Sequence, residues 1–195
     1  MLKRLEARES IRRAGGEQSV MNAKWIAIAA CALLPACSGV TSLFQVNPTA
    51  TAVLAPTRGN EAAGSVHFTQ KGGVVLVDAR ISGLTPFGAH GFHIHLRGDC
   101  SASDASSAGG HFDPPEARRI GAGSIGRPAG ELGVLRADET GQATLRTQIP
   151  GISLSAGPLS VIGRSVIVHA DTESAPDESK RIACGLISKN PDKFF

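Results

Sequence analysis

The sequence predicts an all-β fold, a sandwich or a barrel, for the C-terminal part of the chain. Short segments that alternate apolar and polar residues recur from about residue 66 onward, and Gly-rich or Asp-containing turns separate them. No stretch keeps a helical periodicity over three turns. Regularly spaced short strands with such joints are typical of a sandwich or a barrel.

The expected strands can be placed one by one. Two strands at 66–70 and 74–81 are joined by Lys71-Gly72-Gly73, a hairpin signal. The segment 92–96 alternates with a period of two and forms a third strand. Further strands are expected later in the chain, at 133–137, 143–149 and 161–169, with a turn at 138–141 between the first two of them.

The N-terminal region has the composition of an export signal. Lys24 precedes an apolar run over 25–34, and small residues follow it. The run is too short for a membrane-spanning helix. Translation starts at Met1 or at Met21, and residues 1–36 are expected to be removed.

The segment Leu34-Pro35-Ala36-Cys37 resembles a bacterial lipobox, in which the Cys carries lipid and becomes the first mature residue. Cys31 lies within the apolar run and would leave too short an apolar segment before it. We therefore expect lipidation at Cys37, a tether over 37–51 and a β domain over 52–195. The alternative is a plain signal peptide cut near the same place.

The distribution of charge along the chain argues against a nucleic-acid partner. The chain carries a formal net charge of +3, but the basic excess lies within residues 1–36, and 37–195 are formally neutral. No basic stripe remains to indicate a nucleic-acid partner.

Cys31 would be removed and Cys37 would carry lipid, so two cysteines are left to pair, Cys100 and Cys184. An even pair in an exported domain predicts a disulfide. The alternative is two buried free thiols.

Four of the six histidines form a candidate metal site. His93 and His95 project from the same face of a strand, because residues i and i+2 face the same way. His111 follows a Gly-Gly pair, and His169 ends an apolar strand. A disulfide between Cys100 and Cys184 would draw the loop of His111 toward His169. Four imidazoles suit zinc or copper, and copper(II) binds such sites more tightly. The alternative for the first pair is two surface histidines by chance.

Five separated motifs resemble the copper/zinc superoxide dismutase family in order and spacing, over about residues 52–188. The motifs are His90-Gly91-Phe92-His93-Ile94-His95, Gly98-Asp99-Cys100, Ser107-Ala108-Gly109-Gly110-His111-Phe112-Asp113-Pro114, Gly163-Arg164-Ser165-Val166-Ile167-Val168-His169 and Arg181-Ile182-Ala183-Cys184-Gly185.

The resemblance implies an eight-stranded Greek-key β-barrel with copper as cofactor and superoxide as substrate. It implies a disulfide between Cys100 and Cys184. It also implies that Arg181 attracts and orients superoxide, and that Arg181 and His111 are the catalytic residues. The implied copper ligands are His93, His95, His111 and His169.

The chain departs from the family at the zinc site. The positions of the remaining zinc ligands align with Arg119, Pro128 and Glu131. Neither Arg nor Pro can bind zinc, and a structural zinc site needs four ligands. The segment between His169 and Arg181 is also short. Both departures are similar to the copper-only branch of the family, so we expect no zinc and an open copper site.

Glu131 is expected to take over one role of the missing zinc. A metal-bound imidazole gives its other ring N–H to an acceptor. Glu131 is an acceptor and Arg119 has only donors, so Glu131 is expected to orient His111, directly or through water, with Arg119 neutralising the carboxylate. Glu116 is the nearest rival, and the alternative is that both Glu side chains are simply solvated.

The remaining polar residues near these motifs have structural interpretations. His90 is expected to be structural, and His67 to be solvated or packed. An acidic run is interpreted as a solvated loop that would repel superoxide, at Asp171, Glu173, Asp177 and Glu178.

The sequence therefore predicts a copper-dependent superoxide dismutase that faces the periplasm as a membrane lipoprotein. Ser38 after the lipidated Cys is compatible with the outer membrane. One alternative is a non-catalytic, copper-buffering lipoprotein on the same barrel, and another is a metal-free interaction module. The four histidines argue against the module, and Arg181 favours an enzyme over a buffer. The sequence makes no prediction of the oligomeric state.

Overall fold

The structure is a computed structural model that describes residues 46–119, 128–172 and 180–189, without the side chains of Arg118 and Arg119. The signal peptide, Cys31 and the lipidation of Cys37 therefore lie outside the described residues, as do Glu173, Asp177 and Glu178. In the part of the chain that is described, no helix has the length and apolar character that crossing a membrane requires.

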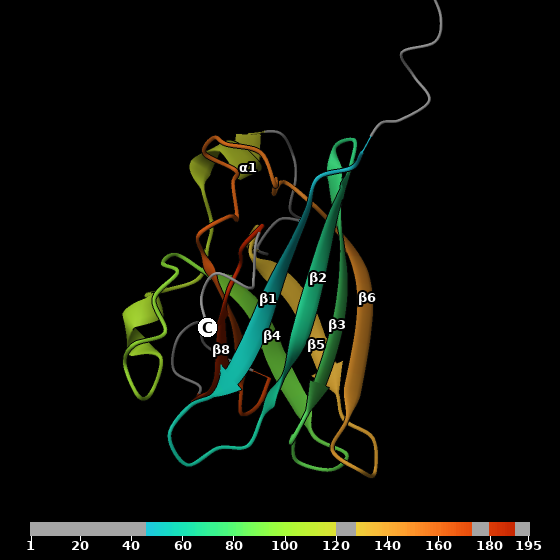
Figure 1. The fold of residues 1–195 in the computed structure, drawn as a ribbon, viewed down its shortest axis with the longest axis vertical. Helices are drawn as coiled ribbons and strands as arrows, with labels where there is room; N and C mark the ends of the chain where they lie inside the picture. Colours follow the sequence, from blue (N-terminus) through green and yellow to red (C-terminus); the bar gives the residue numbers. More distant parts are fainter. Residues whose placement is uncertain (1–45, 120–127, 173–179, 190–195) are drawn as a thin grey trace, which may run out of the picture. The chain divides into compact units, whose positions relative to one another are not determined.

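Eight antiparallel strands form the domain, and the predicted all-β fold is confirmed (Figure 1). The strands are β1 (Thr49–Pro56), β2 (Ala63–Lys71), β3 (Val74–Ser82), β4 (Ala89–His95), β5 (Glu131–Arg136), β6 (Ala143–Pro150), β7 (Ser165–His169) and β8 (Arg181–Leu186). A 3₁₀ turn, η1 (Ser106–Ala108), and a short helix, α1 (Pro115–Arg119), lie between β4 and β5.

The strands run in the order β5-β4-β7-β8-β1-β2-β3-β6, and the outer strands β5 and β6 contact each other, so the sheet is a nearly closed barrel. Three neighbouring pairs are not consecutive in the chain, namely β4 with β7, β1 with β8, and β3 with β6. Such pairs need connections across the ends of the barrel, as in a Greek key.

Local chemistry explains the turns that the sequence predicted. The β2–β3 hairpin closes through Gly72-Gly73, with Lys71 opposite Val74 and a φ of 54° at Gly72, a value that glycine adopts without strain. In the β5–β6 turn, the Asp138 carboxylate accepts hydrogen bonds from the backbone N–H of Thr140 and of Gln142, at 2.8 and 3.0 Å.

Three elements differ from the prediction. β1 begins at Thr49, inside the segment expected to be a tether. Its buried residues include Ala50 and Ala52, whose small side chains give a weak hydrophobic signal, so this strand was not recognised in the sequence. β8 was not predicted as a strand. The strand expected at 161–169 is confined to β7, because a turn with a φ of 78° at Gly163 precedes it.

The core fills the barrel and also extends outside it. β1, β2 and β3 bury every second residue, whereas β7 is buried along its whole length. The outer side of β7 and β8 is covered by the loop after β4, where Ala105 and Ala108 pack with Ile167 and Cys184. This covering loop also carries the residues that complete the metal centre.

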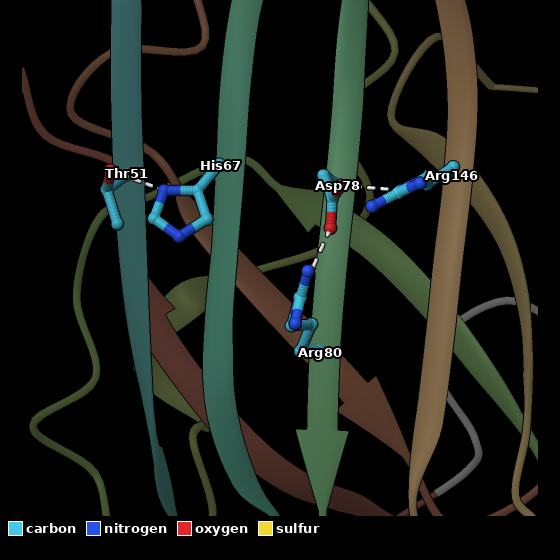
Figure 2. A network of polar contacts seen from close by, with 5 residues as sticks. All are labelled: Thr51, His67, Asp78, Arg80 and Arg146. Atoms are coloured by element: carbon cyan, nitrogen blue, oxygen red, sulfur yellow. Dashed lines mark hydrogen bonds and ion pairs between the residues drawn. The ribbon is translucent and has the colours of Figure 1, made fainter.

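The outer face of the other half of the barrel is polar (Figure 2). Thr51, His67, Asp78 and Arg146 lie opposite one another on β1, β2, β3 and β6. The Arg146 guanidinium donates to Asp78 at 2.7 Å, and Thr51 Oγ1 lies 3.2 Å from His67 Nδ1. His67 is exposed, in agreement with its interpretation as a solvated residue. Exposed pairs of this kind contribute about 0–1 kcal/mol each.

Candidate metal centre

Two neighbouring strands supply three of the four predicted ligands. His93 and His95 lie on β4, and His169 is the last residue of β7. β4 and β7 pair antiparallel, with His93 opposite Ile167. All three imidazoles are buried, so the sheet itself holds them together.

The fourth ligand, His111, is brought to the end of β4 by backbone pairing. His95 and His111 form an antiparallel bridge, and Phe112 N–H donates to Ile94 C=O at 2.8 Å. Gly130 completes this arrangement, because its N–H donates to Phe112 C=O at 2.7 Å and its C=O accepts from Ile94 N–H at 2.8 Å. A Cβ at Gly130 would lie 2.6 Å from the Ile94 oxygen, so only glycine fits between these segments.

The four imidazoles converge. Each offers one ring nitrogen, and these four nitrogens lie within 4.8 Å of one another. Two buried nitrogens, His93 Nδ1 and His111 Nε2, have no hydrogen-bond partner. The Nε2 atoms of His95 and His169 lie 3.3 Å apart. The arrangement therefore directs four imidazole nitrogens at one point.

The opposite nitrogens of two ligands have partners that fix the rings. His95 Nδ1 lies 2.7 Å from the Gly109 carbonyl oxygen, and a carbonyl can only accept, so this nitrogen carries the proton. His95 Nε2 is then free to bind a metal. His93 Nε2 lies 3.0 Å from Glu131 Oε2, which leaves Nδ1 of His93 as its inward atom.

Burial keeps the His95 ring uncharged. Desolvation lowers the pKa of His95 to about 2, and the positive charge of Arg181 contributes in the same direction, against the hydrogen bond to Gly109. His95 is therefore unprotonated near neutral pH and can bind a metal without first losing a proton.

Glu131 is the first residue of β5 and lies opposite His93, next to a bulge between Phe92 and His93. Its second oxygen accepts from Gly133 N–H at 2.9 Å, which fixes the carboxylate. The contact found is with His93, and the expected contact with His111 stays a prediction. The β4–β5 register decides this partner, and the sequence does not reveal that register.

The other residues that align with zinc ligands of the family are placed less fully. Arg119 ends α1, and its side chain lies outside the described residues. Pro128 is half-buried, and Glu116 lies in the first turn of α1. Within the described ranges, the four histidines are the one group of three or more His, Cys, Asp or Glu side chains with convergent ligand atoms.

The predicted disulfide is confirmed between Cys100 and Cys184, whose Cα atoms lie 5.8 Å apart. It ties the loop after β4 to β8. In that loop, Ala105 C=O accepts a hydrogen bond from Nη1 of Arg181 at 2.7 Å. Arg181 lies opposite His169 in the β7–β8 pairing. The same loop thus holds the Arg181 guanidinium and, through Gly109, the His95 ring.

Two further predicted residues support the backbone of the site. His90 is buried, and its Nδ1 lies 2.9 Å from the His169 carbonyl oxygen, in agreement with a structural role. Asp171 has an exposed side chain, but its carbonyl accepts from Gly91 N–H at 2.9 Å. Sequence reasoning missed the carbonyls of Ala105 and Gly109, which no residue type or motif marks.

The fold, the disulfide and the four-histidine cluster can now be set beside known families. The family model for copper/zinc superoxide dismutase matches residues 62–187. The chain belongs to the copper/zinc superoxide dismutase family. The match contains all four histidines, both bonded cysteines and Arg181. Membership in the superoxide dismutase family supports superoxide dismutase activity, with the histidine cluster as the metal site.

Proposed function

We propose that this protein is a copper-only superoxide dismutase of the cell envelope. The observation that carries the proposal is the convergence of four imidazole nitrogens beside former zinc positions that hold Arg119, Pro128 and Glu131.

The residues present fit copper. A metal–imidazole bond of about 2.0 Å keeps opposite nitrogens about 4 Å apart, so nitrogens within 4.8 Å need only small side-chain movements. The buried, unpartnered His93 Nδ1 and His111 Nε2 are the atoms that a metal would satisfy. All-nitrogen sites favour copper(II) over zinc in affinity. Bound copper would supply the change of oxidation state that oxidises one superoxide to oxygen and reduces a second to hydrogen peroxide.

The chain's own residues supply charge and protons. Arg181 carries the fixed positive charge that attracts and orients the superoxide anion, and Ala105 C=O holds its guanidinium in place. His111 is half-buried, whereas the other three ligands are buried. His111 is therefore the ligand through which protons can enter from solvent to form hydrogen peroxide.

The absence of zinc is proposed from the chemistry of the replaced ligands. Pro128 has no side-chain donor atom, and the Arg119 guanidinium is a cation without lone pairs to give. Glu131 is already engaged with His93 Nε2 and with Gly133 N–H. One carboxylate and one imidazole are fewer than the four ligands of a closed structural zinc site.

The envelope location is proposed from the export features. The lipobox-like Leu34-Pro35-Ala36-Cys37 supports a lipid-anchored form, and the Cys100–Cys184 disulfide is typical of an oxidising compartment. Cys37→Ser should release the protein from membranes or leave the precursor uncleaved, because several acyl chains together hold firmly. Unlipidated mature protein that starts elsewhere by mass spectrometry would contradict the anchor.

The deciding experiment combines elemental analysis with superoxide turnover. The copper-loaded protein should hold about one copper and no stoichiometric zinc, and His169→Ala should reduce turnover to that of free copper. His67→Ala is the matched control, because His67 is exposed on the outer face and should not affect the copper site. Equal zinc and copper would refute the copper-only form. Stoichiometric copper without turnover would leave the copper-buffering function instead.

A further inference from the structure

A hollow with a volume of about 430 Å³ lies where three segments meet. They are the start of the β1–β2 loop, the start of β8, and the loop after β4 that contains Cys100, which is called the disulfide-bonded loop below. We call the hollow the Arg58 hollow. The residues that matter in it are Thr57, Arg58, Asn60, Asp104, Lys180 and Arg181. No part of the proposed copper chemistry uses Arg58, Asn60 or Lys180.

Hydrogen bonds fix the frame of the hollow. Thr57 is buried, its N–H donates to Ile182 C=O at 3.1 Å, and its hydroxyl donates to Arg181 C=O at 2.8 Å. Arg58 N–H donates to Ser103 C=O at 2.8 Å, which joins the β1–β2 loop to the disulfide-bonded loop. Asn60 Nδ2 donates to Thr57 Oγ1 at 2.6 Å. Only the backbone of Arg58 takes part, so its side chain remains available to a ligand.

The described residues that line the hollow carry an excess of positive charge. Among them, Arg58, Lys180 and Arg181 are cations, and Asp104 carries the one carboxylate. That carboxylate already accepts from Ser106 N–H at 3.0 Å. Among the described residues, no carboxylate lies within ion-pair distance of Arg58 or Lys180. Arg58 and Lys180 thus bring positive charge to the hollow that no carboxylate of the described residues offsets within ion-pair distance.

We propose that the Arg58 hollow binds a phosphate monoester group or free phosphate. Phosphate carries a charge of about −1.5 to −2 near neutral pH, which matches an excess of two cations. Guanidinium groups donate two parallel hydrogen bonds to such an oxyanion, and an ammonium group adds a point charge. The ligand can be a soluble phosphate or the phosphate of a lipid headgroup, and both present the same group to Arg58 and Lys180.

The test is isothermal titration calorimetry of inorganic phosphate and of glycerol phosphate into the copper-loaded protein, repeated with the copper-free protein. Binding should be saturable and should weaken at high salt. Arg58→Ala and Lys180→Ala should each raise the Kd roughly three- to tenfold. Arg80→Ala is the matched control, because it removes the same charge from an exposed side chain on the outer face of β3 and should leave the Kd unchanged.

Vesicle binding identifies the source of the phosphate. Vesicles of phosphatidic acid that bind in an Arg58-dependent manner, with neutral phosphatidylcholine vesicles as the reference, would assign the hollow to a lipid headgroup. Binding of soluble phosphate without vesicle binding would assign it to a free phosphate. The proposal is overturned if neither probe binds, or if Arg58→Ala and Lys180→Ala bind phosphate with the same Kd as the wild type. The copper-free titration separates this result from any failure of the proposed copper chemistry.

Discussion

The Glu131 carboxylate lies 3.0 Å from Nε2 of His93, while the other ring nitrogen, Nδ1, is buried without a hydrogen-bond partner. An anion behind a metal-binding imidazole raises the basicity of the ligand and so favours the more highly charged metal. In this protein the arrangement should stabilise copper(II) relative to copper(I).

Glu131→Gln keeps the size of the side chain but removes the charge. We expect copper(II) affinity to fall roughly 10- to 100-fold and the reduction potential of bound copper to rise. Competition with a chelator and a potentiometric titration measure the two quantities. Glu116→Gln is the matched control, because it removes the same charge from α1. An effect of Glu116→Gln without an effect of Glu131→Gln would contradict this account and assign the role to Glu116.

Arg181 should act on the substrate rather than on the metal. Arg181→Ala should retain stoichiometric copper but lower kcat/KM by about tenfold or more, since electrostatic attraction raises association rates by about 10–10³. The remaining rate should depend less on ionic strength. Stopped-flow decay of superoxide at several salt concentrations checks both. Loss of copper from the variant, or an unchanged salt dependence, would refute the guiding role.

The stability of the copper-free protein should depend on pH through His95. Burial lowers the pKa of His95 to about 2, so between about pH 2 and 6.5 the unfolded chain binds a proton that the folded chain does not. The free energy of unfolding should therefore fall as pH decreases below about 6.5, by up to about 1.4 kcal/mol per pH unit from this one group.

Urea unfolding between about pH 5 and 7 separates this effect from that of the carboxyl groups, which are mostly ionised in both states there. His95→Gln should flatten the curve, and His67→Gln, which replaces an exposed imidazole on the outer face, is the matched control. Equal slopes in the wild type and in His95→Gln would show that another group is responsible.

Gly130 should tolerate no side chain. In Gly130→Ala the added Cβ would meet the Ile94 oxygen at 2.6 Å and the Phe112 oxygen at 2.9 Å, and backbone atoms cannot easily move. We expect a loss of about 1–3 kcal/mol of stability together with weaker copper binding, because His111 is next to Phe112. Gly73→Ala is the control, since no atom lies within 4 Å of its added Cβ. Equal unfolding midpoints of the two variants would contradict this account.

Much of the site could be predicted from the sequence because it depends on local patterns. The period of two places His93 and His95 on one face, and the Gly72-Gly73 hairpin follows from turn chemistry alone. The partner of Glu131 could not be predicted in this way, because it depends on strand register and on a bulge. Strand β1 escaped prediction because small alanines give little hydrophobic contrast.

The backbone carbonyls that hold His95 and Arg181 were also beyond sequence reasoning. Every residue has a carbonyl, so nothing in the residue types marks those of Gly109 and Ala105. They acquire their roles only because the disulfide-bonded loop packs against β7 and β8.

The pairing of the first strand with the last has a consequence for the order of events during synthesis. Thr51 and Ser188 exchange two backbone hydrogen bonds, of 2.8 and 2.9 Å, and β8 lies between β1 and β7 in the sheet. A growing chain therefore cannot close its barrel before its final segment emerges, and contacts this distant in sequence form slowly. A chain that ends before Arg181 lacks both the strand that joins the two halves of the sheet and the second cysteine. We expect such fragments to retain no partial metal site and to be degraded, so that each molecule in the cell carries either the complete centre or none of it.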